Sequence, residues 1–310
     1  MRAIEVPGLP KPLSVLVLGT MNMKPEDKES AFELLDTYSS SGGTALDTAH
    51  VYGGGLSEQA LGLWMQARGN RANMVVITKG CHPLPGGPPR VTPEAIRRDI
   101  GESLLRLQTD HVDLYLLHRD DETVPVGPII EALNGEIAGG RISAFGASNW
   151  RAERIDEANA YVVSNRLRGF SASSINMSLA EPHKQIWDGC LSMDARTLSW
   201  HAVTRLPLLA WSAQARGLFS PRYESGEPWR QELLELYDTP SNRGRLERAR
   251  SLASRRGATA NRVALAWVLA RNFPVAAVIG PRNAAQLADS LAALEIRFNP
   301  EEMSFLAGNR

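Results

Sequence analysis

The chain has 310 residues, and its 34 lysines and arginines balance 34 aspartates and glutamates to a formal net charge of zero. A protein that binds nucleic acid usually carries a basic excess, so this balance argues against that class, and no apolar run is long enough to cross a bilayer. Cys81 and Cys190 are the only cysteines, which excludes a disulfide framework and predicts a cytoplasmic protein.

Segments typical of strands alternate with helical patterns along almost the whole chain. The apolar runs that we interpret as strands cover 13–19, 44–48, 74–79, 112–118, 142–148, 169–173, 206–211 and 275–280. Ser57 and Thr92 are the expected N-caps of two helices. The stretch 182–193 has no clear pattern, and a final helix is expected over 284–296.

Eight strand–helix units in a chain of this length predict a (β/α)8 TIM barrel, an α/β fold that forms a single domain over residues 1–310. The alternative is an open doubly wound sheet, which would carry a G-x-G-x-x-G fingerprint after its first strand. The sequence LGTMNMKPED at 18–27 does not contain that fingerprint. We therefore expect the barrel, in which active sites lie at the carboxyl ends of the strands.

Four polar residues end successive strands of this barrel or closely follow them. Asp47 ends the second strand, Lys79 the third and His118 the fourth, and Tyr52 lies in the loop after Asp47. Each of these residues, taken alone, is more often structural than catalytic. Their shared position at strand ends predicts one pocket that contains a carboxylate, an ammonium, an imidazole and a phenol.

These four groups suit proton transfer to a carbonyl oxygen. The phenol of Tyr52 is a weak acid, with an unperturbed pKa of about 10. We expect the ammonium of Lys79 to lower that pKa and Asp47 to hold the ammonium in place. A neutral His118 would orient the carbonyl group. None of the four supplies electrons, so a hydride would have to come from a nicotinamide.

Five stretches, in order over nearly the whole chain, resemble the aldo-keto reductase superfamily. They are LDTAHVYGGGLSE (46–58), VVITKG (75–80), DLYLLHRDD (113–121), GRISAFGASNW (140–150) and VIGPRNAAQLADSLAAL (278–294). The resemblance implies a (β/α)8 barrel that binds NADP(H) without a Rossmann fold. It also implies a catalytic tetrad at Asp47, Tyr52, Lys79 and His118, with Tyr52 as the general acid and base.

The resemblance further implies which residues bind the cofactor. Ser148 and Asn149 match the pair that bonds the nicotinamide carboxamide, and Ser174 stands where the family commonly has glutamine. Arg282 is the candidate for the 2′-phosphate, because a guanidinium suits phosphate geometry, and Arg216 is the candidate counter-charge for the pyrophosphate. The full expected set is Gly19, Thr20, Met21, Asp47, Ser148, Asn149, Ser174, Trp211, Ser212, Ala213, Gln214, Arg216, Gly280, Arg282, Gln286 and Ser290. Gln286 and Ser290 replace the arginine and asparagine that many members carry there.

We expect an NADPH-dependent enzyme that reduces an aldehyde or ketone to an alcohol, with a small-molecule carbonyl compound as its partner. Two alternatives stay open: a sugar or polyol 1-dehydrogenase that works oxidatively, and a nicotinamide-binding redox-sensing regulatory protein with little turnover. Segments 82–91, 119–127 and 213–240 are expected to shape the substrate pocket. Cys81 and His82 are adjacent, but no further ligands follow at a suitable spacing, so no metal site is expected. The neutral charge favours no oligomeric state.

Overall fold

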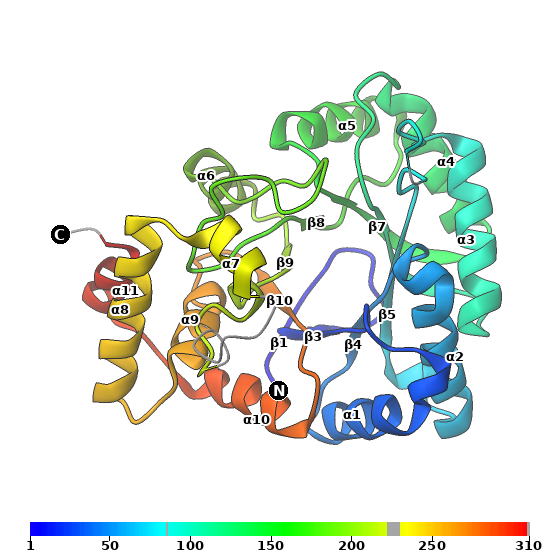
Figure 1. The fold of residues 1–310 in the computed structure, drawn as a ribbon. Coiled ribbons are helices and arrows are strands. Elements are labelled where there is room, and N and C mark those ends of the chain that lie inside the picture. Colours follow the sequence, from blue (N-terminus) through cyan, green and yellow to red (C-terminus); the bar gives the residue numbers. More distant parts are fainter. Residues whose placement is uncertain (85, 222–229, 309–310) are drawn as a thin grey trace.

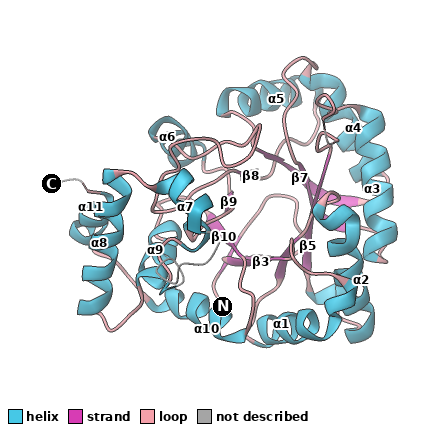
Figure 2. Ribbon diagram, in the orientation of Figure 1, coloured by secondary structure: helices cyan, strands magenta, loops and turns pink. Residues whose placement is uncertain are grey.

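The computed structural model describes residues 1–84, 86–221 and 230–308, and within them eight parallel strands close into a barrel (Figures 1 and 2). The barrel strands are β3 (Leu16–Gly19), β4 (Ala45–Asp47), β5 (Val75–Gly80), β6 (Val112–Leu117), β7 (Ile142–Ser148), β8 (Ser173–Ser174), β9 (Leu208–Ala210) and β10 (Val275–Ile279). Strand β10 pairs with both β9 and β3, which closes the ring. The predicted (β/α)8 barrel is confirmed.

Helices surround the barrel on its outer side (Figure 2). They are α1 (Lys28–Ser40), α2 (Leu56–Arg68), α3 (Pro93–Leu107), α4 (Val126–Ala138), α5 (Ala152–Asn165), α6 (Ala195–Thr204), α7 (Arg230–Tyr237), α8 (Pro240–Arg255), α9 (Ala260–Leu269), α10 (Ala284–Ala292) and α11 (Pro300–Ala307). Short 3-10 turns are η1 (Pro25–Asp27), η2 (Tyr52–Gly55), η3 (Arg71–Asn73), η4 (Ala215–Gly217) and η6 (Ala293–Glu295). None of the described helices is long and apolar enough to span a membrane.

The first predicted strand, 13–19, is wrong as a single element. Leu13–Ser14 forms β2, which pairs antiparallel with β1 (Ala3–Ile4), and only Leu16–Gly19 enters the barrel. Val6 in the turn of this hairpin belongs to the same hydrophobic cluster as Ala45 and Val75, the first residues of β4 and β5. The hairpin therefore closes the amino end of the barrel, and the opposite end remains for a ligand.

Two further boundary predictions are corrected. The strand expected over 169–173 is β8 at Ser173–Ser174, although the N–H of Ser171 already donates to the carbonyl oxygen of Phe145 in β7. Ser57 is not an N-cap, since α2 begins at Leu56 and the buried Ser57 hydroxyl donates to the carbonyl oxygen of Thr20 at 2.7 Å. Thr92 does cap α3, where its side chain accepts from the N–H of Ala95.

Gly146 in β7 lies where the barrel interior leaves no room for a side chain. A Cβ there would lie 2.5 Å from the carbonyl oxygen of Ala172 and 2.7 Å from Leu116 Cδ2. We expect Gly146→Ala to lower the free energy of unfolding by about 1–3 kcal/mol, because a backbone oxygen cannot move aside. Gly135→Ala is the matched control: its Cβ would meet nothing within 4 Å in the exposed α4 face, and it should stabilise by about 0.5–1 kcal/mol. Urea unfolding of both variants measures the difference, and equal effects would contradict this packing.

Candidate active site

The alternation of side chains along the strands decides which strand-end residues face the barrel interior. In β5, Val75 and Ile77 belong to the interior cluster, whereas Val76 packs in the layer between strands and helices. The two-residue period therefore turns Lys79 inward at the carboxyl end of β5. By the same alternation, the inward residues at the carboxyl ends of β4, β6, β7 and β8 are Asp47, His118, Ser148 and Ser174.

Lys79 lies at the centre of this group. Its Nζ donates to Oδ1 of Asp47 at 2.7 Å, to the carbonyl oxygen of Thr48 at 2.8 Å and to the Tyr52 hydroxyl at 3.2 Å. Lys79 is only 4% exposed. Burial alone would lower the pKa of Lys79, but the adjacent Asp47 carboxylate and the Tyr52 hydroxyl together outweigh it and hold this pKa above its usual value. The ammonium therefore stays charged and fixes the phenol and the carboxylate on either side of it.

Tyr52 reaches Lys79 because of the glycines that follow it. Tyr52 opens η2, and Gly53, Gly54 and Gly55 adopt φ values of 59°, 67° and 98°. Backbone with positive φ is readily accessible only to glycine, so the sequence YGGG permits a tight turn directly after the strand-end loop. The turn holds the Tyr52 ring with its centroid 4.8 Å from Lys79 Nζ.

The Lys79 ammonium lowers the pKa of Tyr52, as expected, but it does not set the net shift. Burial raises the pKa of Tyr52 more than the ammonium lowers it, and the Asp47 carboxylate raises it further. The pKa of the phenol is therefore above its usual value, and the hydroxyl stays protonated at neutral pH. A protonated phenol held at a fixed point suits the donation of a proton.

His118 presents its ring to Tyr52 from the neighbouring strand β6. The two ring centroids lie 5.7 Å apart in an edge-on arrangement, and Nδ1 of His118 is buried with no hydrogen-bond partner in the described part of the chain. Burial holds the pKa of His118 well below its usual value, and the charges of Lys79 and Arg119 lower it further. The imidazole is therefore neutral, as expected from the sequence, and it can bond to a carbonyl oxygen.

Residues with left-handed backbone closely follow three of the strands. Cys81 after β5, Asn149 after β7 and Ser212 after β9 have φ values of 60°, 60° and 49°. Residues other than glycine seldom adopt this conformation; outside helix C-caps such as Gln108, this backbone strain often occurs at functional sites. The three positions turn the chain sharply around the carboxyl end of the barrel.

The side chain of Asn149 connects the ends of β6 and β7 with the segment that contains Leu191. Its Nδ2 donates to the carbonyl oxygen of His118 at 3.2 Å and to Ser148 Oγ at 3.1 Å, and its Oδ1 accepts from the N–H of Leu191 at 3.1 Å. Both Nδ2 hydrogens are therefore engaged within the protein. Asn149 fixes the strand ends of β6 and β7, and Ser148 keeps its own hydroxyl hydrogen available for a ligand.

Removing the Asn149 side chain separates its hydrogen bonds from its backbone strain. We expect Asn149→Ala to lower the free energy of unfolding by about 2–4 kcal/mol, because it leaves buried polar groups unpaired and places alanine at positive φ. Asn149→Gly loses the same hydrogen bonds without the strain, so it should be about 1 kcal/mol less destabilising. Urea unfolding at one temperature compares the two. An alanine variant as stable as the wild type would show that these hydrogen bonds contribute nothing.

Ser174 differs from its neighbour Ser148 in lacking a partner. The two residues pair in register across β7 and β8, and the carbonyl oxygen of Ser174 accepts from the N–H of Asn149. The Ser174 hydroxyl is buried and has no hydrogen-bond partner in the described part of the chain. Because an unpaired buried hydroxyl is costly, Ser174 is suited to bond to a ligand that lies across these strand ends.

The loop after β9 is tied to α10. Nε2 of Gln214 donates to Ser290 Oγ at 3.2 Å, and Ser290 Oγ donates to the backbone carbonyl of Gln286. Arg216, expected as a counter-charge for phosphate, forms an ion pair with Glu232 at 2.8 Å instead. Ala213 in this loop is fully buried, and Trp211 before it places its ring 5.7 Å from that of Trp187.

The start of α10 carries the residues expected to bind the adenosine phosphate. Asn283 caps the helix, and its side chain accepts from the N–H of Gln286 at 3.0 Å. The Gln286 side chain in turn accepts from the N–H of Arg282 at 2.8 Å. Arg282 and Gly280 are exposed, so the guanidinium of Arg282 is accessible to an anion.

The chain after β3 forms the rim beside Asp47. Gly19 ends β3, where a Cβ would lie 3.2 Å from the carbonyl oxygen of Ile279. Thr20 is buried and donates to the carbonyl oxygen of Asp47 at 3.1 Å, whereas Met21 is 47% exposed. Thr20 therefore supports the strand end, and Met21 offers an accessible surface above it.

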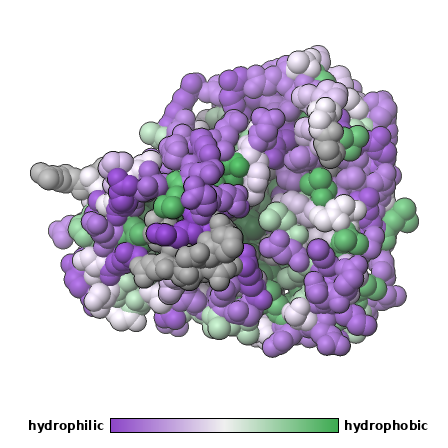
Figure 3. All heavy atoms as spheres, in the orientation of Figure 1, coloured by the Kyte–Doolittle hydropathy of each residue, from purple (hydrophilic) through white to green (hydrophobic). Residues whose placement is uncertain are grey.

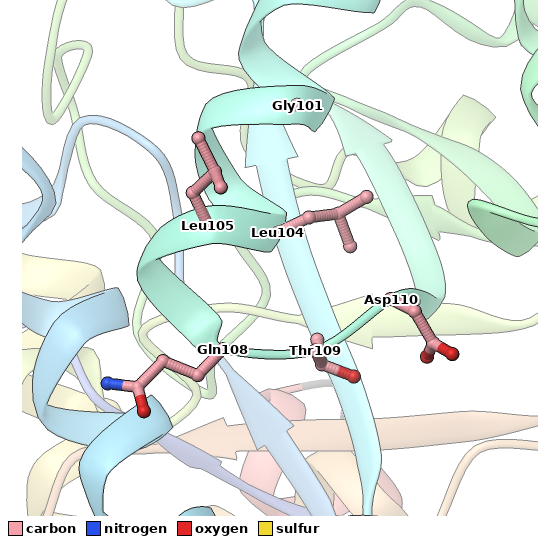
Figure 4. Close-up of a pocket in the computed structure, with 6 residues that line it drawn as sticks. All are labelled: Gly101, Leu104, Leu105, Gln108, Thr109 and Asp110. Carbon is pink, nitrogen blue, oxygen red and sulfur yellow. The ribbon is translucent and has the colours of Figure 1, made fainter.

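Figure 3 shows this side of the molecule hollowed near the centre of the barrel, with apolar residues inside the hollow. The described residues contain no cluster of three or more histidine, cysteine or acidic side chains that could hold a metal ion. A separate open groove on the outer surface of α3 lies near the amino end of β6, away from the carboxyl ends of the strands (Figure 4). It is lined by Gly101, Leu104, Leu105, Gln108, Thr109 and Asp110.

A family model described as the aldo/keto reductase family matches residues 15–308. The chain belongs to the aldo/keto reductase family. Its relatives include the uncharacterised oxidoreductase YrpG of Bacillus subtilis, 32% identical over 95% of this chain and 91% of the relative. Norsolorinic acid reductase stcV of Emericella nidulans is 29% identical over 94% of this chain and 76% of the relative. The NADP(+) aryl-alcohol dehydrogenase of Phanerodontia chrysosporium is 29% identical over 93% and 77%.

Trp187 at the mouth of this aldo/keto reductase was missed from the sequence, whereas His82 and Arg119 were placed only within segments expected to shape the substrate pocket. The ring centroid of His82 lies 4.9 Å from that of His118, Trp187 contacts Trp211, and Arg119 is buried beside His118. Arg119 carried a signal, since it directly follows His118 in LHRDD. Trp187 carried none, because it lies in the stretch without a clear pattern. Tyr223 and Trp229, in a segment expected to shape the pocket, lie outside the described residues.

Proposed function

We propose that this aldo/keto reductase reduces an aldehyde or ketone to an alcohol with NADPH, and that Tyr52 donates the proton. The observation that carries the proposal is the placement of a protonated phenol 3.2 Å from a buried ammonium, with a neutral imidazole ring beside it. Aspartate, lysine and histidine are available to position and tune that phenol. The names of the relatives support this class of reaction, since they include reductases and an alcohol dehydrogenase.

The proton leaves the Tyr52 hydroxyl toward a carbonyl oxygen held between Tyr52 and His118. The Lys79 ammonium stabilises the phenolate that forms, because a charge of opposite sign lies within hydrogen-bond distance. Asp47 keeps the ammonium aimed at the phenol. His118, neutral and buried, bonds to the carbonyl oxygen and orients it.

The residues at the mouth fit a nicotinamide. The unpaired buried hydroxyl of Ser174 and the available hydrogen of Ser148 lie across neighbouring strand ends, where they can bond to a carboxamide. Trp211 presents an indole beside them for stacking, and its Nε1 is buried without a partner among the described residues. When bound, the nicotinamide supplies the hydride.

Substitution of Arg282 tests whether the protein binds NADPH more tightly than NADH. We expect NADPH to quench the tryptophan fluorescence of the wild type with a Kd about 10-fold or more below that of NADH, because an accessible guanidinium bonds well to a 2′-phosphate. Arg282→Ala should weaken NADPH binding to about the level of NADH and leave NADH binding unchanged. Arg297→Ala, at another exposed arginine, is the matched control. Equal affinity of the wild type for both cofactors would remove the role given to Arg282.

The direction of the reaction separates this proposal from its alternatives. An oxidative sugar or polyol dehydrogenase would use the same residues with Tyr52 as the base, and it would turn over sugars with NADP+ faster than it reduces aldehydes. A redox-sensing regulatory protein would bind the cofactor and show little turnover in either direction. A panel of aldehydes, quinones, aldoses and steroids, assayed in both directions, distinguishes the three.

A further inference from the structure

Arg119 occupies an unusual position at the carboxyl end of β6, directly after His118. Its side chain is buried, with only 8% of the residue exposed. Nη1 donates to the carbonyl oxygen of His118 at 2.9 Å, and Nε donates to the carbonyl oxygen of Asp188 at 3.1 Å. The backbone is held as well, because Nε1 of the buried Trp150 donates to the carbonyl oxygen of Arg119 at 3.0 Å. The guanidinium is therefore fixed in place rather than extended into solvent.

This buried cation has no counter-charge among the residues that the structure describes. Arg119 forms no ion pair with any carboxylate in the described ranges. Two of its five N–H groups bond to carbonyl oxygens, and the guanidinium also bonds to the neutral thiol of Cys190, which supplies no charge. Other arginines near the mouth are paired: Arg90 with Asp99, and Arg216 with Glu232. Buried charges are normally paired, so an unpaired guanidinium at a site indicates that an anionic group comes from elsewhere.

The guanidinium lies beside the candidate active site, because its Nη1 bonds to the backbone carbonyl oxygen of His118. Its positive charge also lowers the pKa of Tyr52, His82 and His118. These rings meet edge-on, with centroids 5.7 Å apart for Tyr52 and His118 and 4.9 Å apart for His82 and His118. A group bound beside these rings at the carboxyl end of the barrel is therefore within the field of Arg119.

The segment 187–190 connects Arg119 with the opposite part of the mouth. Arg119 bonds to it at Asp188 and packs against Gly189, where a Cβ would lie 3.2 Å from Arg119 Cδ. Trp187, at the start of this segment, lies against Trp211 after β9. A flat substrate that reaches Tyr52 thus passes aromatic surfaces and a fixed cation.

We propose that Arg119 binds an anionic oxygen substituent of the substrate, so that this aldo/keto reductase prefers aromatic carbonyl compounds that carry a carboxylate or an ionised phenol. This inference rests on the proposed carbonyl reduction and names its substrate class. The anionic substituent supplies the counter-charge for Arg119, and the carbonyl group lies between Tyr52 and His118. Charge-assisted hydrogen bonds of this kind are stronger than neutral ones.

The test compares matched substrates. The carboxylate arm uses 3- and 4-carboxybenzaldehyde against their methyl esters, and the phenol arm uses 4-hydroxybenzaldehyde against 4-methoxybenzaldehyde at a pH above the ionisation of the phenol. For at least one pair, the wild type should show a higher kcat/KM for the anion. Arg119→Gln should lower kcat/KM for that anion by about 10- to 100-fold relative to its neutral partner. Arg119→Lys, which keeps the charge, should retain part of the preference.

Arg271→Gln is the control variant. Arg271 also lacks an ion pair within the described ranges, but its guanidinium lies over the Trp267 ring in a groove with Pro274, at the amino end of β10. It should leave the ratio of anion to neutral partner unchanged. An equal loss for anion and neutral partner in Arg119→Gln would mean that Arg119 only positions His118 and segment 187–190, and it would overturn the proposal.

A binding measurement keeps this test independent of turnover and of variant folding. Calorimetry of the wild-type protein should show tighter binding of 4-carboxybenzoate or 4-hydroxybenzoate than of dimethyl terephthalate, and added sodium chloride should weaken the anions selectively. If the wild type reduces no aldehyde but binds these anions in this way, the proposed reaction fails and the anion site stands. If neutral and anionic compounds bind equally well, the anion site fails whatever the enzyme reduces.

Discussion

Tyr52→Phe should lower kcat for aldehyde reduction by about 10²- to 10⁴-fold, the range by which a positioned general acid accelerates a reaction. Phenylalanine keeps the ring that packs beside Lys79 and His118 and removes only the hydroxyl. NADPH should therefore bind to the variant with nearly unchanged affinity, because the groups proposed for the cofactor lie on β7, β8, β9 and α10. Steady-state kinetics and fluorescence quenching measure the two effects separately.

The matched control is Tyr161→Phe, which removes a hydroxyl that donates to Glu131 on the outer helices. It should leave kcat unchanged. Retention of full activity in Tyr52→Phe would show that another group donates the proton. A loss of activity accompanied by an equal loss of NADPH binding would show instead that Tyr52 shapes the cofactor site.

Lys79→Met should affect both stability and catalysis. The substitution leaves the Asp47 carboxylate buried without its cation, and the loss of one partner of a buried ion pair costs about 3–5 kcal/mol. It also removes the charge that stabilises the Tyr52 phenolate, so kcat should fall along with the free energy of unfolding. Urea unfolding and carbonyl reduction by the soluble variant measure these losses.

The double variant Asp47→Asn with Lys79→Met separates the two effects. It removes both charges, so much of the stability should return, whereas activity should not. If the single variant were as stable as the wild type, the Asp47–Lys79 pair would not be the buried ion pair described here. If the double variant regained activity, the charge of Lys79 would have no role in proton transfer.

The positions of Asp47, Lys79 and His118 could be predicted from the sequence because they depend on simple geometry. Parallel strands put their carboxyl ends at one face of the barrel, and the two-residue alternation then decides which side chains face inward. The buried apolar runs before each residue were long enough to reveal that pattern. The exact ends of the strands could not be predicted in this way. Leu13–Ser14 belongs to a hairpin, but its apolar pattern is equally typical of a barrel strand.

Other features depend on contacts between segments far apart in the chain. The direction of the Tyr52 pKa shift is a balance of burial and the Asp47 carboxylate, which raise the pKa, against the Lys79 ammonium, which lowers it, and burial exists only in the folded barrel. Serine is a common N-cap residue, but the Ser57 hydroxyl donates instead to the carbonyl oxygen of Thr20 on another segment. Arg119 is held by a hydrogen bond to the carbonyl oxygen of Asp188, which lies 69 residues further along the chain in a stretch without helical or strand periodicity. Such features require the structure.

Transfer of deuterium from the cofactor tests most directly whether the protein reduces a carbonyl group with NADPH and with Tyr52 as the proton donor. The wild-type protein is supplied with NADPH that carries deuterium at both C4 positions and with 3-carboxybenzaldehyde, and the alcohol is analysed by mass spectrometry and NMR. We expect an alcohol with one deuterium on the former carbonyl carbon, formed by the wild type and at least about 10²-fold more slowly by Tyr52→Phe. Alcohol without deuterium, or no alcohol from a protein that binds NADPH and the aldehyde, would contradict this expectation.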